Sequence, residues 1–259
     1  MNVLRNRLKR YPRLKKYIKA PFYFIQGVPP VYHTEISPEF IRECVDKPDP
    51  VILEIGCNSG SHTLWFLQAF SRPRIHCFEP DPRAIARFKK KVGERENVAL
   101  HEIALSDRDG EITFHQSDGQ RDESQVQLLP EGWDFSGSIR KPKDHLKEYP
   151  WVTFEHSITV PTMTLDHWCR DRQIEHIDFI WMDVQGAEMD VINGGRATLQ
   201  KTRYLYTEYS TKELYEGQAT LKSLLKNLPE FKALIRYPND ILLQNARFPF
   251  KRMTHWPAY

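Results

Sequence analysis

Cysteine is scarce in this chain, and its few cysteines form no paired motif. Among 259 residues the four are Cys44, Cys57, Cys77 and Cys169. Their wide separation excludes the short Cys-Cys spacings that zinc sites and redox motifs use. Because an isolated cysteine behaves as a small hydrophobe, we expect reduced thiols in or near the core.

Long apolar runs are also missing. No stretch approaches the roughly 20 residues that span a bilayer, and the N-terminal charges are not followed by the apolar segment of a secretory signal. A chain of this length with 40% hydrophobic residues can bury one substantial core. We therefore expect a cytoplasmic protein built mainly from one domain.

Acidic residues are absent before Glu35, although the formal net charge of the whole chain is only +3. Residues 1–19 contain eight lysines and arginines, with leucine and isoleucine at roughly helical spacing among them. This pattern favours a basic helix on an anionic membrane surface or on nucleic acid, and a solvated leader is the alternative interpretation. We assign residues 1–45 to a basic N-terminal arm with a helical extension.

From residue 50 onward, short β-rich runs alternate with helical stretches, which indicates an α/β fold with helices on both faces of a mostly parallel sheet. The predicted parallel strands are 51–55, 74–78, 98–101, 177–182 and 204–207. The predicted helices are 61–71, 82–92, 165–173, 187–199 and 212–227, the last capped by Ser210 or Thr211. The runs 231–236 and 241–244 predict a C-terminal antiparallel hairpin, which completes a seven-stranded sheet.

Residues 110–160 interrupt this alternation before the fourth parallel strand. They contain strand-like runs at 112–115 and 154–160, separated by a polar stretch rich in Gly, Ser and Asp. Long connections on the carboxyl-end side of a parallel sheet are common places for binding loops. We therefore expect this insertion to face the substrate.

The strongest motif follows the first predicted strand and leads into a helix. It reads Glu54-Ile55-Gly56-Cys57-Asn58-Ser59-Gly60. Glycines permit a sharp turn and the close approach of a ligand, and the free amides of the next helix can receive a carboxylate. An acid such as Glu54 can organise this loop.

A second acid, Glu79, ends the next predicted strand, roughly 20 residues after the loop. A carboxylate at this position can accept both ribose hydroxyls, as in dinucleotide-binding folds. The loop nevertheless breaks the G-x-G-x-x-G fingerprint at its second and third glycines, which disfavours a pyrophosphate ligand. S-adenosylmethionine (SAM) has no pyrophosphate and is the preferred cofactor, with a dinucleotide-dependent oxidoreductase as the alternative.

Acidic residues also follow the fourth and fifth parallel strands, where ligands of open α/β sheets bind. These residues are Asp183 and Glu208. Methyl transfer to an alcohol needs an aligned acceptor oxygen that loses its proton, and either acid could be the general base. Together they could instead bind a divalent cation, although the sequence shows no clear spacing of metal ligands. Capping of the following helix is an alternative role for Asp183.

Five separated motifs between about 50 and 210 occur in an order that resembles the FkbM family of SAM-dependent methyltransferases. They are the glycine loop, Phe78-Glu79-Pro80, Ala104-Leu105-Ser106-Asp107, Thr164-Leu165-Asp166, and Asp183-Val184-Gln185-Gly186-Ala187-Glu188. The resemblance implies a Rossmann-like class I methyltransferase domain over residues 46–259. By position it assigns the cofactor to Glu54, Gly56, Asn58, Gly60, Glu79 and Asp183, with Ala104, Leu105 and Ser106 near the adenine.

The resemblance also implies O-methylation, either of a sugar in a surface polysaccharide or glycan or of a secondary-metabolite hydroxyl. Gln185 stands where the family often has Glu, which removes a carboxylate beside Asp183 and weakens the metal hypothesis. A SAM-fold protein that binds without catalysis is a further alternative. A nucleic-acid methyltransferase is disfavoured, because no base-flipping Asn-Pro-Pro-Tyr loop follows the fourth strand.

Overall fold

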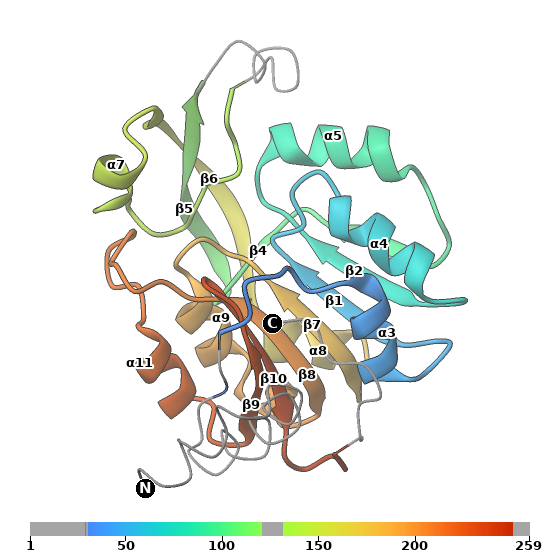
Figure 1. Ribbon diagram of the computed structural model, residues 1–259. Coiled ribbons are helices and arrows are strands. Elements are labelled where there is room, and N and C mark those ends of the chain that lie inside the picture. The colour runs from blue at the N-terminus through green and yellow to red at the C-terminus, as the bar shows by residue number, and fades with distance from the viewer. Residues whose placement is uncertain (1–28, 30, 121–131, 251–259) are drawn as a thin grey trace, which may run out of the picture.

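A seven-stranded sheet forms the centre of the computed structural model, which describes residues 29, 31–120 and 132–250 (Figure 1). Its order is β3-β2-β1-β7-β8-β10-β9, and β10 runs antiparallel to both of its neighbours. The strands are β1 (Val51–Ile55), β2 (Arg74–Phe78), β3 (Val98–His101), β7 (Ile177–Met182), β8 (Thr202–Glu208), β9 (Phe231–Arg236) and β10 (Asp240–Asn245). The predicted sheet and its C-terminal hairpin are confirmed.

Helices cover both faces of this sheet, because successive side chains of each strand point to opposite sides. One core, around Ile52 and Phe179, packs against α3 (Pro38–Val45), α4 (Ser61–Ala69) and α5 (Pro82–Val92). The other core, around Leu53 and Ile180, packs against α8 (Leu165–Asp171), α9 (Glu188–Gly194), α10 (Arg196–Leu199) and α11 (Leu221–Lys226). The predicted helix 187–199 is divided into α9 and α10, with Gly195 between them.

The predicted helix 212–227 is wrong in its first half. Helix α11 begins after Thr220, whose hydroxyl accepts a hydrogen bond from the Ser223 amide. The preceding residues pair instead with the backbone of the insertion, where the Glu216 amide donates to the Lys141 carbonyl oxygen at 2.9 Å. Ser210 and Thr211 therefore cap no helix, because long-range pairing replaces local helical bonds in this segment.

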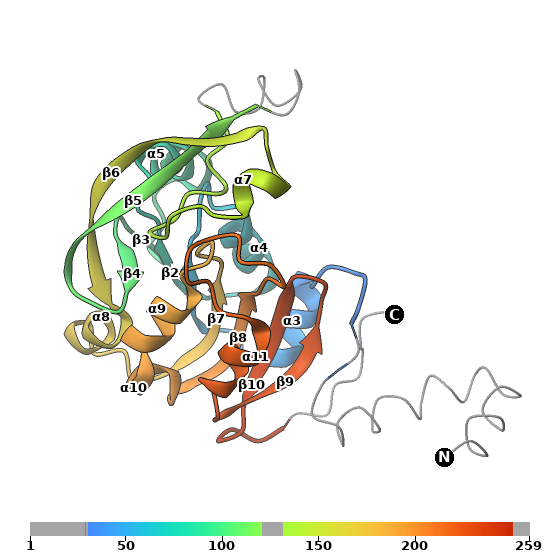
Figure 2. The same cartoon turned by 90° about the vertical axis from the view of Figure 1, so that its left-hand side faces the viewer.

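The insertion contributes β5 and most of β6 to a second sheet, whose order is β4-β6-β5. Its strands are β4 (Ala104–Ser106), β5 (Gly110–Gly119) and β6 (Val152–Thr164), and a short helix α7 (His145–Glu148) lies beside the far end of β5 and β6 (Figure 2). The two predicted strand-like runs are confirmed and are longer than expected. Residues 132–140 return over the carboxyl ends of β1 and β7, where they contact Asn58 and Gln185.

Of the N-terminal segment 1–45, the structure describes residues 29 and 31–45, which include α3. Its basic part, residues 1–19, lies outside the described residues, so the helix predicted there and its membrane contact stay predictions. Within the part that the structure describes, none of the helices is long and apolar enough to cross a bilayer. The four cysteines are buried free thiols, as predicted.

Candidate active site

The glycines of the loop after β1 allow close packing between parts of the protein. Gly56 has a φ of 83°, and a Cβ there would lie 1.8 Å from the carbonyl oxygen of Asp183. Gly60 has a φ of 79°, and its missing Cβ leaves room for Phe88 and Val92 of α5. Both positions need glycine. The neighbours that require it are protein groups, whereas the sequence interpretation assigned that space to a ligand.

Glu54 is completely buried and lies behind this loop. Its Oε2 accepts a hydrogen bond of 2.5 Å from the Thr63 hydroxyl in α4, and Oε1 has no hydrogen-bond partner among the described residues. Burial raises the pKa of this carboxyl to about 8. Glu54 therefore connects β1 to α4 and supports the loop from the interior.

Glu79 directly follows β2, and its carboxyl accepts a hydrogen bond from the same loop. Its Oε2 accepts a hydrogen bond of 2.8 Å from the Asn58 amide, and its Oε1 accepts one of 2.9 Å from the Asp81 amide. Burial raises the pKa of Glu79 to about 8, although these two amide bonds act in the opposite direction. The carboxyl is thus held in one orientation and keeps lone pairs for further donors.

A cleft opens at the carboxyl ends of β1, β2 and β7. The sequence-predicted cofactor residues in its lining are Gly56, Asn58, Glu79, Ala104, Leu105 and Asp183. Apolar side chains complete it, among them Phe78, Ile103 and Phe114. Glu54, Gly60 and Ser106 lie outside this lining, and the Ser106 hydroxyl instead forms a 2.8 Å hydrogen bond with Thr162 of β6.

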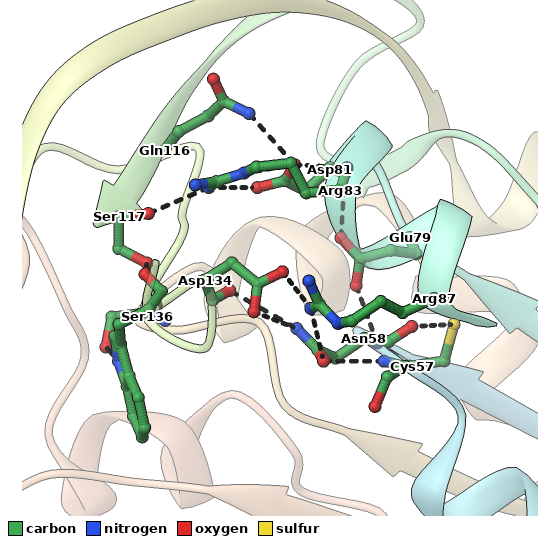
Figure 3. A network of polar contacts seen from close by, with 12 residues as sticks. Cys57, Asn58, Glu79, Asp81, Arg83, Arg87, Gln116, Ser117, Asp134 and Ser136 are labelled. Carbon is green, nitrogen blue, oxygen red and sulfur yellow. Dashed lines mark hydrogen bonds and ion pairs between the residues drawn. The ribbon is translucent and has the colours of Figure 1, made fainter. Parts of the chain in front are cut away.

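One side of the cleft is closed by a part of the insertion that the sequence did not single out. Asp134 is buried and forms an ion pair with Arg87 of α5, and its carbonyl oxygen accepts a hydrogen bond of 3.4 Å from Asn58 Nδ2 (Figure 3). Nearby, Arg83 donates to the Ser117 carbonyl oxygen of β5 at 2.9 Å. These contacts fasten the insertion to the loop after β1 and to α5. A sequence signal is lacking because Arg87 and Asp134 are 47 positions apart in unrelated segments.

The carboxyls of Asp183 and Glu208 both accept hydrogen bonds from the side-chain amide of Gln185. Gln185 Nε2 donates to Asp183 Oδ1 at 2.7 Å and to Glu208 Oε2 at 3.1 Å. On the other side of this amide, the Tyr215 hydroxyl lies 3.1 Å from Gln185 Oε1 and 2.8 Å from the Ser136 carbonyl oxygen. Because both acids accept and only the nitrogen of the amide donates, the orientation of Gln185 is determined. The structure thus brings together the two catalytic candidates predicted from the sequence.

Burial raises the pKa of both carboxyls. The rise is large for Glu208, where the nearby charge of Asp183 adds to burial, while hydrogen bonds from Gln185 and Glu208 oppose it at Asp183. The two groups therefore titrate as a pair, and Asp183 is the member whose ionised form is better stabilised.

The surroundings of this pair do not suit a divalent cation. The amide hydrogens of Gln185 point at both carboxyls and take the position that a bridging cation would need. Across the described ranges, the His, Cys, Asp and Glu side chains form no group of three or more that could hold a metal ion.

A larger cavity of about 580 Å³ adjoins the cleft. Phe135, Asp183 and Gln185 line both spaces, so the cleft and the cavity meet at these three side chains, which we call the junction. Glu208 lines the larger cavity, together with residues of the insertion and of the segment 209–218. A ligand in the cleft and a second ligand in the cavity would therefore face each other across the junction.

The mostly parallel sheet, with its C-terminal antiparallel hairpin and a cleft at its strand ends, is the fold of a Rossmann-like methyltransferase. Residues 54–240 match the methyltransferase FkbM domain, and the chain belongs to the FkbM family of SAM-dependent methyltransferases. This membership argues against the alternative of a dinucleotide-dependent oxidoreductase.

The 2-O-methyltransferase NoeI of Sinorhizobium fredii is 51% identical over 211 residues, which are 80% of this chain and 84% of NoeI. The AMB antimetabolite synthetase AmbE of Pseudomonas aeruginosa is 29% identical and matches 77% of this chain but 10% of its own length. A solved structure of a putative rRNA methylase from Clostridium thermocellum matches with a TM-score of 0.45 and 10% identity, over 82% of this chain and 97% of that chain. The similarity to NoeI supports methyl transfer to oxygen.

Proposed function

We propose that this enzyme methylates a hydroxyl group of a sugar in a polysaccharide or glycan. The observation that carries the proposal is the junction, where the cleft and the larger cavity share Phe135, Asp183 and Gln185. The name of the relative NoeI, a 2-O-methyltransferase, supports an alcohol oxygen as the acceptor. Carboxyl, hydroxyl and amide groups in the larger cavity, including Glu208 and Gln218, suit a ligand with many hydroxyls.

The cleft residues fit SAM in chemical type. Glu79 would accept hydrogen bonds from the ribose hydroxyls, apolar residues around Leu105 would contact the adenine, and the loop from Gly56 to Gly60 would hold the amino-acid portion. When bound there, SAM supplies an activated methyl group on a positively charged sulfur. Glu54 would act from behind the loop, through Thr63.

Asp183 is the proposed general base. It lines both spaces, and its Oδ1 accepts the hydrogen bond from Gln185 that stabilises its ionised form. Asp183 would take the proton of the acceptor hydroxyl, and Glu208, whose pKa is higher, would orient the same hydroxyl. The insertion would exclude water from the junction, with Phe135 as the covering ring.

The test is methyl transfer from radiolabelled SAM to a panel of polysaccharides, oligosaccharides and non-sugar alcohols. We expect label on the oxygen of a saccharide, located by mass spectrometry of the fragments. Failure of the purified protein to bind SAM, or transfer confined to non-sugar alcohols, would contradict the proposal.

We also propose a cytoplasmic location, which the four buried free thiols support. Contact of residues 1–19 with an anionic membrane is a separate proposal. It predicts that deletion of these residues lowers salt-sensitive co-sedimentation with anionic vesicles. Equal sedimentation of the two proteins would refute it.

A further inference from the structure

A row of aromatic rings leads away from the junction along the larger cavity. The row consists of Phe135, Trp133 and Trp151, and all three line the cavity. The ring centroids of Trp133 lie 4.9 Å from those of Phe135 and 5.0 Å from those of Trp151. We call these three residues the aromatic row.

The rings of the row are held in position and remain accessible. Trp133 Nε1 donates a hydrogen bond of 2.9 Å to the Ser136 hydroxyl, which fixes the indole. Phe135 is 41% exposed, and Trp133 and Trp151 are half-buried. Tyr149, 43% exposed, lines the same cavity. Aromatic surface that faces water in a concave site is typical of a place that a ligand covers.

The other groups around the row are mostly polar. They include Glu148, Ser210, Thr211, Lys212, Gln218 and Asn239, whereas the aliphatic lining consists of Val152 and Leu214. An acyl chain would need a continuous aliphatic lining. A sugar ring has one apolar C–H face, which can lie on an aromatic ring, and a polar edge, which needs donors and acceptors beside it.

The size of the cavity indicates more than one sugar ring. A volume of about 580 Å³ lies within the range that holds a drug-sized ligand. The methylated hydroxyl must lie at the junction, beside Asp183, so its own sugar occupies only the inner end. From Phe135 at the junction the row continues through Trp133 to Trp151, in two steps of 4.9 and 5.0 Å between ring centroids.

We propose that the aromatic row binds the sugar that is attached to the methylated one, so that the acceptor is at least a disaccharide. This proposal rests on the proposed function, because it takes the junction as the place of methyl transfer. It assigns acceptor recognition to Trp133 and Trp151, which line the larger cavity but not the cleft.

The test uses the full chain saturated with S-adenosylhomocysteine (SAH), the product form of the cofactor. Calorimetry compares the methyl glycosides of glucose, galactose, N-acetylglucosamine, fucose and rhamnose with disaccharides that contain them, and with octyl glucoside as the probe for an aliphatic chain. We expect at least one disaccharide to bind tenfold or more tightly than its monosaccharide. We expect Trp133→Ala and Trp151→Ala to remove this gain and to leave SAH affinity unchanged.

Phe250→Ala is the matched control, because Phe250 is 51% exposed and lies outside the cavity lining. Equal affinity for monosaccharide and disaccharide, tighter binding of octyl glucoside, or no saccharide binding by SAH-loaded protein would each overturn the proposal. If Trp133→Ala loses SAH affinity, Trp151→Ala alone decides the outcome. Loss of the proposed function is distinguishable, since it would appear as a wild-type protein that binds no SAH or transfers methyl groups only to non-sugar alcohols.

Discussion

The cleft and the larger cavity share the junction but are held together by different kinds of contact. In the cleft, the loops that follow neighbouring parallel strands meet, with Gly56 against the Asp183 backbone and Glu79 on the Asn58 amide. In the cavity, side chains bridge segments far apart in the chain, as the Tyr215 hydroxyl does by donating to the Ser136 carbonyl oxygen at 2.8 Å, 79 positions away. The cleft therefore depends on short motifs, whereas the cavity depends on tertiary packing.

Loss of the Asp183 carboxylate should affect both regions and have the largest effect. We expect Asp183→Asn to lower the turnover number about 10²-fold to 10⁴-fold, because the amide cannot take the acceptor proton. SAM affinity should fall far less. Glu111→Gln, which changes an exposed acid on β5, is the control. Turnover that stays within about twofold of wild type would remove Asp183 as the base.

A methyl group at Gly56 should disturb the packing of the cleft more than that of the cavity. We expect Gly56→Ala to lower the free energy of unfolding by about 3 kcal/mol or more, since its Cβ would collide with the Asp183 carbonyl oxygen. Gly93→Ala is the matched control, because Gly93 also has positive φ but has open space around it. Its expected cost is about 1–3 kcal/mol, from the backbone conformation alone and without the collision that Gly56→Ala adds. Urea denaturation measures both values, and equal losses would contradict the packing argument.

Substitution of Glu79 should change the affinity for SAM without changing the affinity for a saccharide. We expect Glu79→Gln to weaken SAM binding roughly tenfold to hundredfold, because glutamine has one acceptor oxygen where Glu79 uses two, for the Asn58 and the Asp81 amides. Saccharide affinity of the SAH-saturated variant should stay near the wild-type value. Calorimetry of both ligands tests this split, and a parallel loss of both affinities would show that the regions are not separable.

The two regions also differ in how well the sequence predicts them. The strands and the site residues of the cleft lie in segments where local patterns decide the structure, so 51–55, Glu79 and Asp183 were found at their places. The cavity depends on pairings such as Glu216 with Lys141, which turn a helix-like sequence into an irregular segment. No local signal identifies Asp134, Tyr215 or Trp151 as residues of the site.

The ion pair between Arg87 and Asp134 fastens the insertion, which lines both regions, to α5. We expect Arg87→Met or Asp134→Asn to weaken SAM binding about threefold to tenfold, since each change leaves its partner without a counter-charge beside the loop. The double variant should cost little more than either single one. Additive losses would mean that the two side chains act independently.

The smallest expected effect concerns the pH dependence of turnover. Because Asp183 must be ionised to act as a base and its pKa is raised by burial, the rate should fall as the pH decreases through that pKa. Gln185→Glu removes the amide donor and adds a like charge, which should raise the pKa further. We expect the acidic limb to move about one pH unit upward. A limb that stays in place would show that Gln185 does not stabilise the ionised base.

The crystal structure of the enzyme with SAH and a bound disaccharide tests the central claim most directly. The account predicts that the sulfur of SAH lies at the junction beside Asp183, with its ribose on Glu79, and that one sugar hydroxyl faces it from the larger cavity. A sulfur that points away from Asp183, or a saccharide bound elsewhere on the surface, would contradict it.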